Sequence, residues 1–294
     1  MILHHGAIDE LVTPRGTLRF NQWRWLDSYL HLTGIGGGAG ATLRREWDPA
    51  PQRDGAILHD AYRGARLPVL EGVVVAPDPD SAQALYDDLV SFTDSIMRAD
   101  GTLKFTPRGE AQRQITVQLA DAVQVSGDRL KRFQVALVAA DPAAYSVLDD
   151  TVTSSSLALQ NETGSLALPF PLPFTFGDFA VGGTVTATND GNATSYPTVK
   201  IHGACSAPVV KNITTGKLIS FPTLSISSGD YVQVDMQRRT VLLNGQSSSP
   251  YVRYLDVVTS DFWGLDPGAN SIRLNAATFD ASAKAAVTWR DAWV

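Results

Sequence analysis

Hydrophobic and polar residues alternate with a period of two along most of the second half of the chain, the pattern that half-buried β-strands produce. Turn sequences such as Asp190-Gly191 and Asn244-Gly245 separate these segments about every ten residues. Short strands at this spacing are typical of an all-β sandwich. The predicted strands span residues 183–188, 198–203, 208–211, 218–221, 223–226, 231–236, 240–243, 271–274 and 286–289.

The first half contains one segment with the period of a helix. Leu85, Leu89, Phe92 and Ile96 recur at spacings of four, three and four, which predicts a helix over about residues 81–97 with one apolar stripe. Alternating segments begin near residues 69, 103, 115 and 133. We therefore predict a first domain over residues 1–150, built from a mostly antiparallel sheet with one packed helix.

Three other segments lack such a pattern. Residues 41–66 are rich in charge and show little periodicity, which indicates a long loop that serves as a binding loop or a contact arm. Residues 34–40 are rich in glycine, but the sequence after Gly40 does not open a helix as a dinucleotide site requires, so we interpret them as a flexible loop. Residues 146–168 are interpreted as a linker or an edge strand, with the linker itself at 151–168 and the second domain at 169–294.

The composition excludes several classes of function. The chain of 294 residues carries a net charge of −6 and has no basic run, so we expect no nucleic-acid partner. The first residues do not resemble a signal peptide, and no stretch reaches the roughly 18 apolar residues of a membrane span. We therefore expect no membrane insertion. Cys205 is the single cysteine, is interpreted as a core residue, and belongs to no metal-ligand pattern.

No motif for catalysis, a cofactor or a metal is found in the sequence. The serine-hydrolase and zinc-protease motifs are both absent. The second half has many aspartates, but most adjoin glycines or occupy turn positions, where carboxylates cap the chain. We therefore expect no catalytic, cofactor-binding or metal-binding residues, and no enzyme activity.

The order of motifs after Asn189 is more specific than their spacing. A hairpin over residues 231–245 is followed by Trp263, by Leu265-Asp266-Pro267-Gly268, and by a final Trp289-Arg290-Asp291-Ala292-Trp293. This order resembles the C-terminal domain of the distal tail proteins, also called minor tail proteins, of siphovirus-type bacteriophages. The phrase Asp141-Pro142-Ala143-Ala144-Tyr145 resembles the end of the N-terminal domain in the same family.

The resemblance implies a galectin-like second domain and a structural virion protein at the tip of the phage tail, made in the bacterial host cytoplasm. It implies a homohexameric ring, a hub that joins the tail tube protein to the tail-tip protein of the baseplate. Arm-like loops in this family reach between neighbouring subunits. No catalysis is implied.

Two other hypotheses remain at the level of sequence. One is a carbohydrate-binding baseplate or tail-fibre module for host attachment, with Trp263 as the possible glycan contact. The competing interpretation of Trp263 is a core residue, since tryptophan is usually mostly buried. Trp263, Trp289 and Trp293 are together expected at one end of the sandwich. The other hypothesis is a hydrolase of the tail tip.

Overall fold

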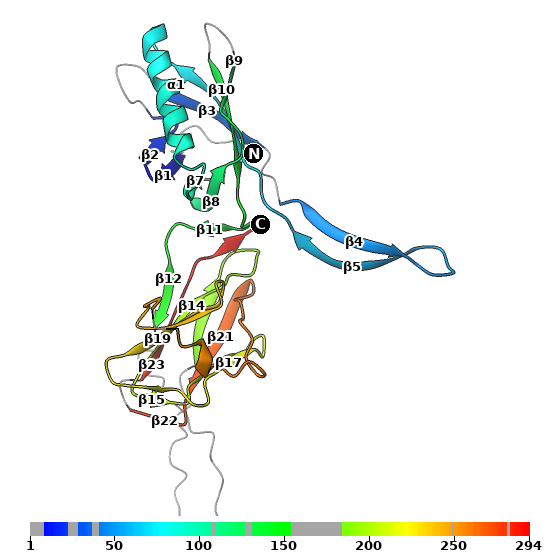
Figure 1. The fold of residues 1–294 in the computed structure, drawn as a ribbon, viewed down its shortest axis with the longest axis vertical. Coiled ribbons are helices and arrows are strands. Elements are labelled where there is room, and N and C mark those ends of the chain that lie inside the picture. Colours follow the sequence, from blue (N-terminus) through cyan, green and yellow to red (C-terminus); the bar gives the residue numbers. More distant parts are fainter. Residues whose placement is uncertain are drawn as a thin grey trace, which may run out of the picture. The chain divides into compact units, whose positions relative to one another are not determined.

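The computed structural model describes residues 9–22, 29–36, 41–107, 110–126, 131–153, 184–248, 250–280 and 283–294 (Figure 1). The chain divides into two compact units. The first contains residues 1–147 together with Trp293 and Val294, and the second contains residues 148–292. The chain therefore passes from one unit to the other twice, once after Val147 and again after Ala292.

The first unit is built on one antiparallel sheet. Its main path has the order β2-β1-β7-β8-β10-β6-β3, and β9, β11 and β24 pair at its margins. The strands are β1 (Glu10–Thr13), β2 (Gly16–Arg19), β3 (Tyr29–Gly36), β6 (Val69–Val75), β7 (Gly101–Phe105), β8 (Arg113–Leu119), β9 (Gln124–Ser126), β10 (Arg132–Val138), β11 (Ala144–Ser146) and β24 (Ala292–Trp293).

Helix α1 (Pro79–Asp94) packs on this sheet, as the sequence predicted. It begins two residues before the predicted start, because Asp78 is the N-cap. The Asp78 carboxylate accepts hydrogen bonds from the Ser81 backbone N–H at 2.9 Å and the Ser81 hydroxyl at 2.7 Å. The predicted stripe is only partly in the helix: Leu85 and Leu89 are buried on α1, whereas the buried Ile96 follows its last residue.

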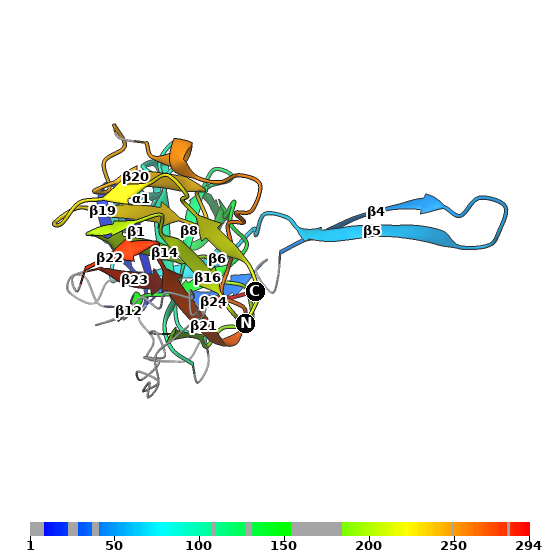
Figure 2. The same ribbon diagram turned by 90° about the horizontal axis from the view of Figure 1, so that it is seen from below.

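The expected loop over residues 41–66 is instead a β-hairpin, so that prediction is wrong in its secondary structure. Strands β4 (Leu43–Pro49) and β5 (Ala56–Arg63) pair only with each other. Both views show this hairpin projecting away from the sheet of its own unit (Figures 1 and 2). We call it the arm.

The second unit is a β-sandwich, which confirms the predicted class. One sheet has the order β12-β23-β14-β19-β20 and the other β13-β21-β16-β17, with β18-β15-β22 as a small third sheet. One core contains residues from both large sheets, such as Ile201 and Val232 from one and Val210 and Leu274 from the other. The strands and the short 3-10 helix are β12 (Asp150–Thr153), β13 (Thr184–Asn189), β14 (Thr198–His202), β15 (Cys205–Ser206), β16 (Val209–Asn212), β17 (Leu218–Ser220), β18 (Ser225–Ile226), β19 (Tyr231–Asp235), β20 (Thr240–Leu243), η1 (Val252–Tyr254), β21 (Gly268–Asn275), β22 (Thr278–Phe279) and β23 (Lys284–Trp289).

The segment between the two predicted domains is only partly described. Residues 150–153 form an edge strand of the sandwich, which is one of the two alternatives considered for residues 146–168. The remainder of the predicted linker, and the proline-rich entry to the predicted second domain, lie outside the described residues.

The three tryptophans expected together are divided between the units. Trp263 and Trp289 belong to the sandwich core, at 0% and 5% exposure. Trp293 instead belongs to the first unit, where the guanidinium carbon of Arg113 lies 4.2 Å from its ring centroid. The prediction that Trp293 packs in the sandwich is therefore wrong, because the chain returns to the first unit after Ala292.

Candidate assembly surface

The arm is held together by strand pairing rather than by a core. Trp47 lies opposite Leu58 and Arg44 opposite Tyr62, with a β-bulge between Arg45 and Trp47. At its tip the backbone N–H of Ala50 donates to the carbonyl of Gly55 at 3.0 Å.

One face of the arm carries a row of exposed apolar side chains. Cross-strand partners share a face of a hairpin, as do residues four apart on the unbulged strand β4, so Leu43, Trp47 and Leu58 point to the same side. They are 65%, 65% and 62% exposed. We call these three residues the arm stripe. On the opposite face, an imidazole nitrogen of His59 lies 2.8 Å from a carboxylate oxygen of Asp48, and both side chains are exposed.

The energetics of the arm favour a partner. A two-stranded hairpin alone in water is at best marginally stable, because it buries little surface. An exposed ion pair such as His59–Asp48 contributes only about 0–1 kcal/mol. An exposed, clustered apolar surface is typical of an interaction site. The arm stripe is therefore the strongest candidate interaction surface in the first unit.

The root of the arm is fixed to the sheet. The Gly64 N–H donates to the carbonyl of Thr42 at 2.7 Å, and a Cβ at Gly64 would come within 2.5 Å of the Thr42 hydroxyl. Two residues later, Arg66 and Ala139 exchange two backbone hydrogen bonds, of 3.0 and 2.8 Å. The projecting strands thus emerge from a defined base.

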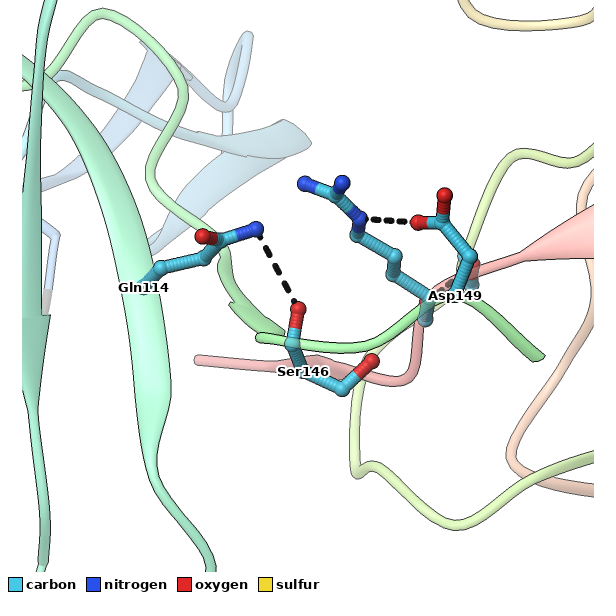
Figure 3. Close-up of polar contacts among 5 residues, drawn as sticks. Gln114, Ser146 and Asp149 are labelled. Carbon is cyan, nitrogen blue, oxygen red and sulfur yellow. Dashed lines mark hydrogen bonds and ion pairs between the residues drawn. The ribbon is translucent and has the colours of Figure 1, made fainter.

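The motif at the end of the first unit is a local hydrogen-bonded turn. The Asp141 carboxylate accepts hydrogen bonds from the Ala143 N–H at 3.0 Å and the Tyr145 hydroxyl at 2.7 Å. On β8, the Gln114 side-chain amide donates to the Ser146 carbonyl at 3.3 Å (Figure 3). The aspartate and tyrosine of this motif therefore shape the exit of the chain from the sheet. Separately, within the second unit, Arg290 forms an ion pair with Asp149 (Figure 3).

The motifs of the second unit converge on the buried Asn189. Its amide nitrogen donates to the carbonyls of Ala193 and Leu265 at 2.8 and 3.1 Å. Its amide oxygen accepts from the N–H groups of Gly191 and Ala292 at 3.1 and 3.3 Å. A Cβ at Gly191 would lie 1.8 Å from the Ala292 carbonyl oxygen, so only glycine allows this approach. The sequence motifs that contain Gly191, Leu265 and Ala292 thus stabilise the fold of the second unit.

Trp263, the candidate glycan contact, is fully buried in the sandwich core. This is the core position considered as the alternative from the sequence. A side chain without exposed surface presents no ring face to a sugar, so the residue supplies no support for glycan binding. Its indole N–H has no hydrogen-bond partner in the part of the chain that the structure describes, and a Trp buried at this depth contributes chiefly through the apolar area of its ring.

The aspartates considered for hydrolysis act in turns. Asp235 accepts hydrogen bonds from the N–H groups of Gln237 and Arg238, at 3.0 and 2.8 Å. Asp256 likewise accepts hydrogen bonds from the Thr259 hydroxyl at 2.7 Å and the Val258 N–H at 3.1 Å, and these contacts lower its pKa. No cluster of three or more potential metal ligands occurs in the described residues.

Cys205 is a buried thiol of the sandwich core, which is the position that the sequence predicted. Burial raises its pKa to about 11, which keeps it protonated and unreactive at neutral pH. No helix in the described part of the chain is long and apolar enough to cross a membrane.

Comparison with known proteins identifies one domain of the chain. Residues 190–293 match the family model of the siphovirus-type tail component, C-terminal domain. This stretch is therefore a siphovirus-type tail component domain. The predicted resemblance to the distal tail proteins is confirmed at this level. No curated protein sequence matches the chain.

The fold extends this similarity over nearly the whole chain. The Dit protein of phage SPP1, described as a paradigm of the hub of the adsorption apparatus in phages that infect Gram-positive bacteria, superposes with a TM-score of 0.67. The match covers 98% of this chain and all of that chain at 11% identity. A chain of the phage P2 baseplate in its activated conformation matches with a TM-score of 0.50, covering 96% of this chain and 97% of that chain at 10% identity. The chain thus has the fold of a Dit hub protein.

Proposed function

We propose that the chain is the hub at the distal end of a long, non-contractile phage tail, where it joins the tail tube to the tail-tip and receptor-binding apparatus. The tail component domain at residues 190–293 and the hub fold along the chain support this assignment. The proposed role is structural, without a catalytic step.

The observation that carries the proposal is the arm. A hairpin with exposed apolar residues on one face and no core of its own is suited to lie on another protein. In a closed ring, each copy offers the same arm to the next copy through a head-to-tail interface. We propose six copies because distal tail hubs match the six-fold tail tube.

The sheet of the first unit gives a second reason for a ring. Among the described strands, its main path ends at β3, where seven residues pair with β6 on one side. The edge of a sheet is a surface to which a strand of another chain can pair. We propose that an arm or a strand from a neighbouring copy covers this edge.

Cryo-electron microscopy of intact virions tests the assignment. The expected result is density for this chain in one closed ring of six copies between the last tail tube ring and the tail tip. Density for this chain on the capsid, along the tube, or only on side fibres would reject it. Labelling with an antibody against the chain provides an independent check of its position.

A further inference from the structure

A small cavity lies in the first unit, close to the root of the arm. Its volume is about 50 Å³, and the first unit alone supplies its walls. A single water needs roughly 10–15 Å³ by the same kind of measure, so the cavity admits a group of a few heavy atoms. The residues that decide its chemistry are Arg66, Arg113, Leu103, Phe105, Ile115 and Trp293.

Arg66 brings an uncompensated charge to this cavity. The residue is only 8% exposed, its Nε atom has no hydrogen-bond partner, and it makes no ion pair within the described part of the chain. Burial lowers the pKa of Arg66, and the nearby charges of Arg113 and Arg63 lower it further. A buried charge without a partner is costly, so the site favours an anion.

Arg113 is the second cation of the cavity, and its position is fixed. Glu110 forms an ion pair with its guanidinium, which also lies over the ring of Trp293. The negative charge of Glu110 offsets Arg113 and leaves Arg66 as the cation without a counter-charge. The strongest binding position for an anion is therefore beside Arg66.

The walls of the cavity select the type of anion. Apart from the two arginines, the side chains that line the cavity are apolar, including Leu103, Phe105 and Ile115, and the backbone of Val294 also lies at its wall. A carboxylate directs two oxygens at a guanidinium and carries an apolar carbon behind them, which matches an apolar wall. A phosphate would place its remaining oxygens against apolar walls, where their desolvation is unfavourable.

We propose that this cavity is a carboxylate-binding site, with Arg66 as the main contact and Arg113 as the second. The carboxylate comes either from an aspartate or glutamate side chain of a docking protein or from a free small molecule. The site stands on the cavity and its charges, and it does not depend on the hub assignment.

The test follows the Arg66 side-chain Nε–H in ¹H–¹⁵N correlation spectra of the full chain at constant ionic strength. The probes are acetate, glutamate blocked as N-acetyl-glutamate amide, and inorganic phosphate. The Arg66→Met variant identifies the resonance and removes the contact. Arg63→Met is the matched control, because Arg63 is an exposed arginine that does not line the cavity.

The expected result is a saturable shift with acetate in the wild type and in the Arg63→Met variant. Isothermal titration should show binding weaker by on the order of tenfold or more in Arg66→Met, because a charge-assisted hydrogen bond is lost. Saturation with the blocked glutamate as well indicates a protein side chain as the ligand. Saturation with acetate alone indicates a free small carboxylate.

Three results would overturn the proposal. They are the absence of a saturable shift with both carboxylates, equal acetate binding by Arg66→Met and the wild type, and tighter binding of phosphate than of acetate. If Arg66→Met does not fold, Arg66→Gln replaces it, and the wild-type titration still decides between the outcomes.

Discussion

Two hairpins in this chain have similar pairing and opposite surroundings. The arm (β4 and β5) and the β19–β20 hairpin are both antiparallel, and both have defined turns. In β19–β20, Val232, Val234 and Val241 are at most 1% exposed. In the arm, the stripe residues Leu43, Trp47 and Leu58 are more than 60% exposed. Pairing alone therefore does not tell where a hairpin obtains its stability.

The difference indicates two origins of stability. The β19–β20 hairpin is stabilised within its own chain, because its apolar face joins the sandwich core. The arm has no such core, so we propose that contact with a neighbouring molecule stabilises it. Substitutions in buried regions should thus change the folding of the free chain, and substitutions in the arm should change assembly.

The largest difference in stability between a buried and an exposed position should come from the ionisation of a carboxylate. Asp9 is fully buried, one carboxylate oxygen has no hydrogen-bond partner among the described residues, and burial raises its pKa from 3.8 to about 6. The folded state then binds the proton more tightly than the unfolded state, so stability falls as pH rises from about 4 to about 6. The difference between the two pKa values corresponds to about 3 kcal/mol.

Asp9→Asn should remove this fall, as measured by urea unfolding of the first unit between pH 4 and pH 7. The matched exposed position is Asp48 on the arm, where Asp48→Asn should change stability by less than about 1 kcal/mol. An unchanged pH profile in Asp9→Asn would show that Asp9 carries no such penalty.

The next effect compares apolar truncations in the two hairpins. Val232→Ala should destabilise the second unit by about 2–3 kcal/mol, through lost transfer energy and a cavity. Leu58→Ala removes a larger apolar group, yet it should change the stability of the free chain by less than about 0.5 kcal/mol. Urea unfolding of the purified chain measures both. Equal losses would mean that the arm is packed within its own subunit.

The smallest effect on the free chain is expected for the whole arm stripe. Replacing Leu43, Trp47 and Leu58 together by serine should leave the unfolding free energy within about 1 kcal/mol of the wild type. Tail assembly should fail, as measured by complementation of a phage that lacks the gene. Ile57→Ser, on the opposite face of the arm, is the control and should still assemble. Normal tails with the triple variant would reject the role of the stripe.

The sequence predicted those elements that have one buried face and one exposed face. The sandwich strands and α1 were predictable because each has one face in a core, which imposes a period on the residues. The arm strands were not predictable, because neither face is buried and Leu43, Trp47 and Ile57 therefore follow no period. The pairing of such strands depends on the turn that joins them and on assembly. Neither produces a clear pattern in the local sequence.

The site residues show the same limit. No local pattern near Trp293 tells which unit the end of the chain joins, since the choice depends on contacts such as that with Arg113. Arg66 lies in a short connection between the arm and β6, and its burial follows from its bonds to Ala139. The residues next to Arg66 in the sequence do not indicate that its charged side chain is buried.

Hydroxyl-radical footprinting of the free chain and of intact tails, read by mass spectrometry, measures whether the arm stripe is covered in the assembly. We predict that Leu43, Trp47 and Leu58 are oxidised in the free chain and are strongly protected in the tail. Trp263, which is buried, should react slowly in both samples and serves as the internal reference. Equal oxidation of Leu43, Trp47 and Leu58 in the free chain and the assembled tail would contradict the claim that the arm is stabilised by a neighbouring molecule.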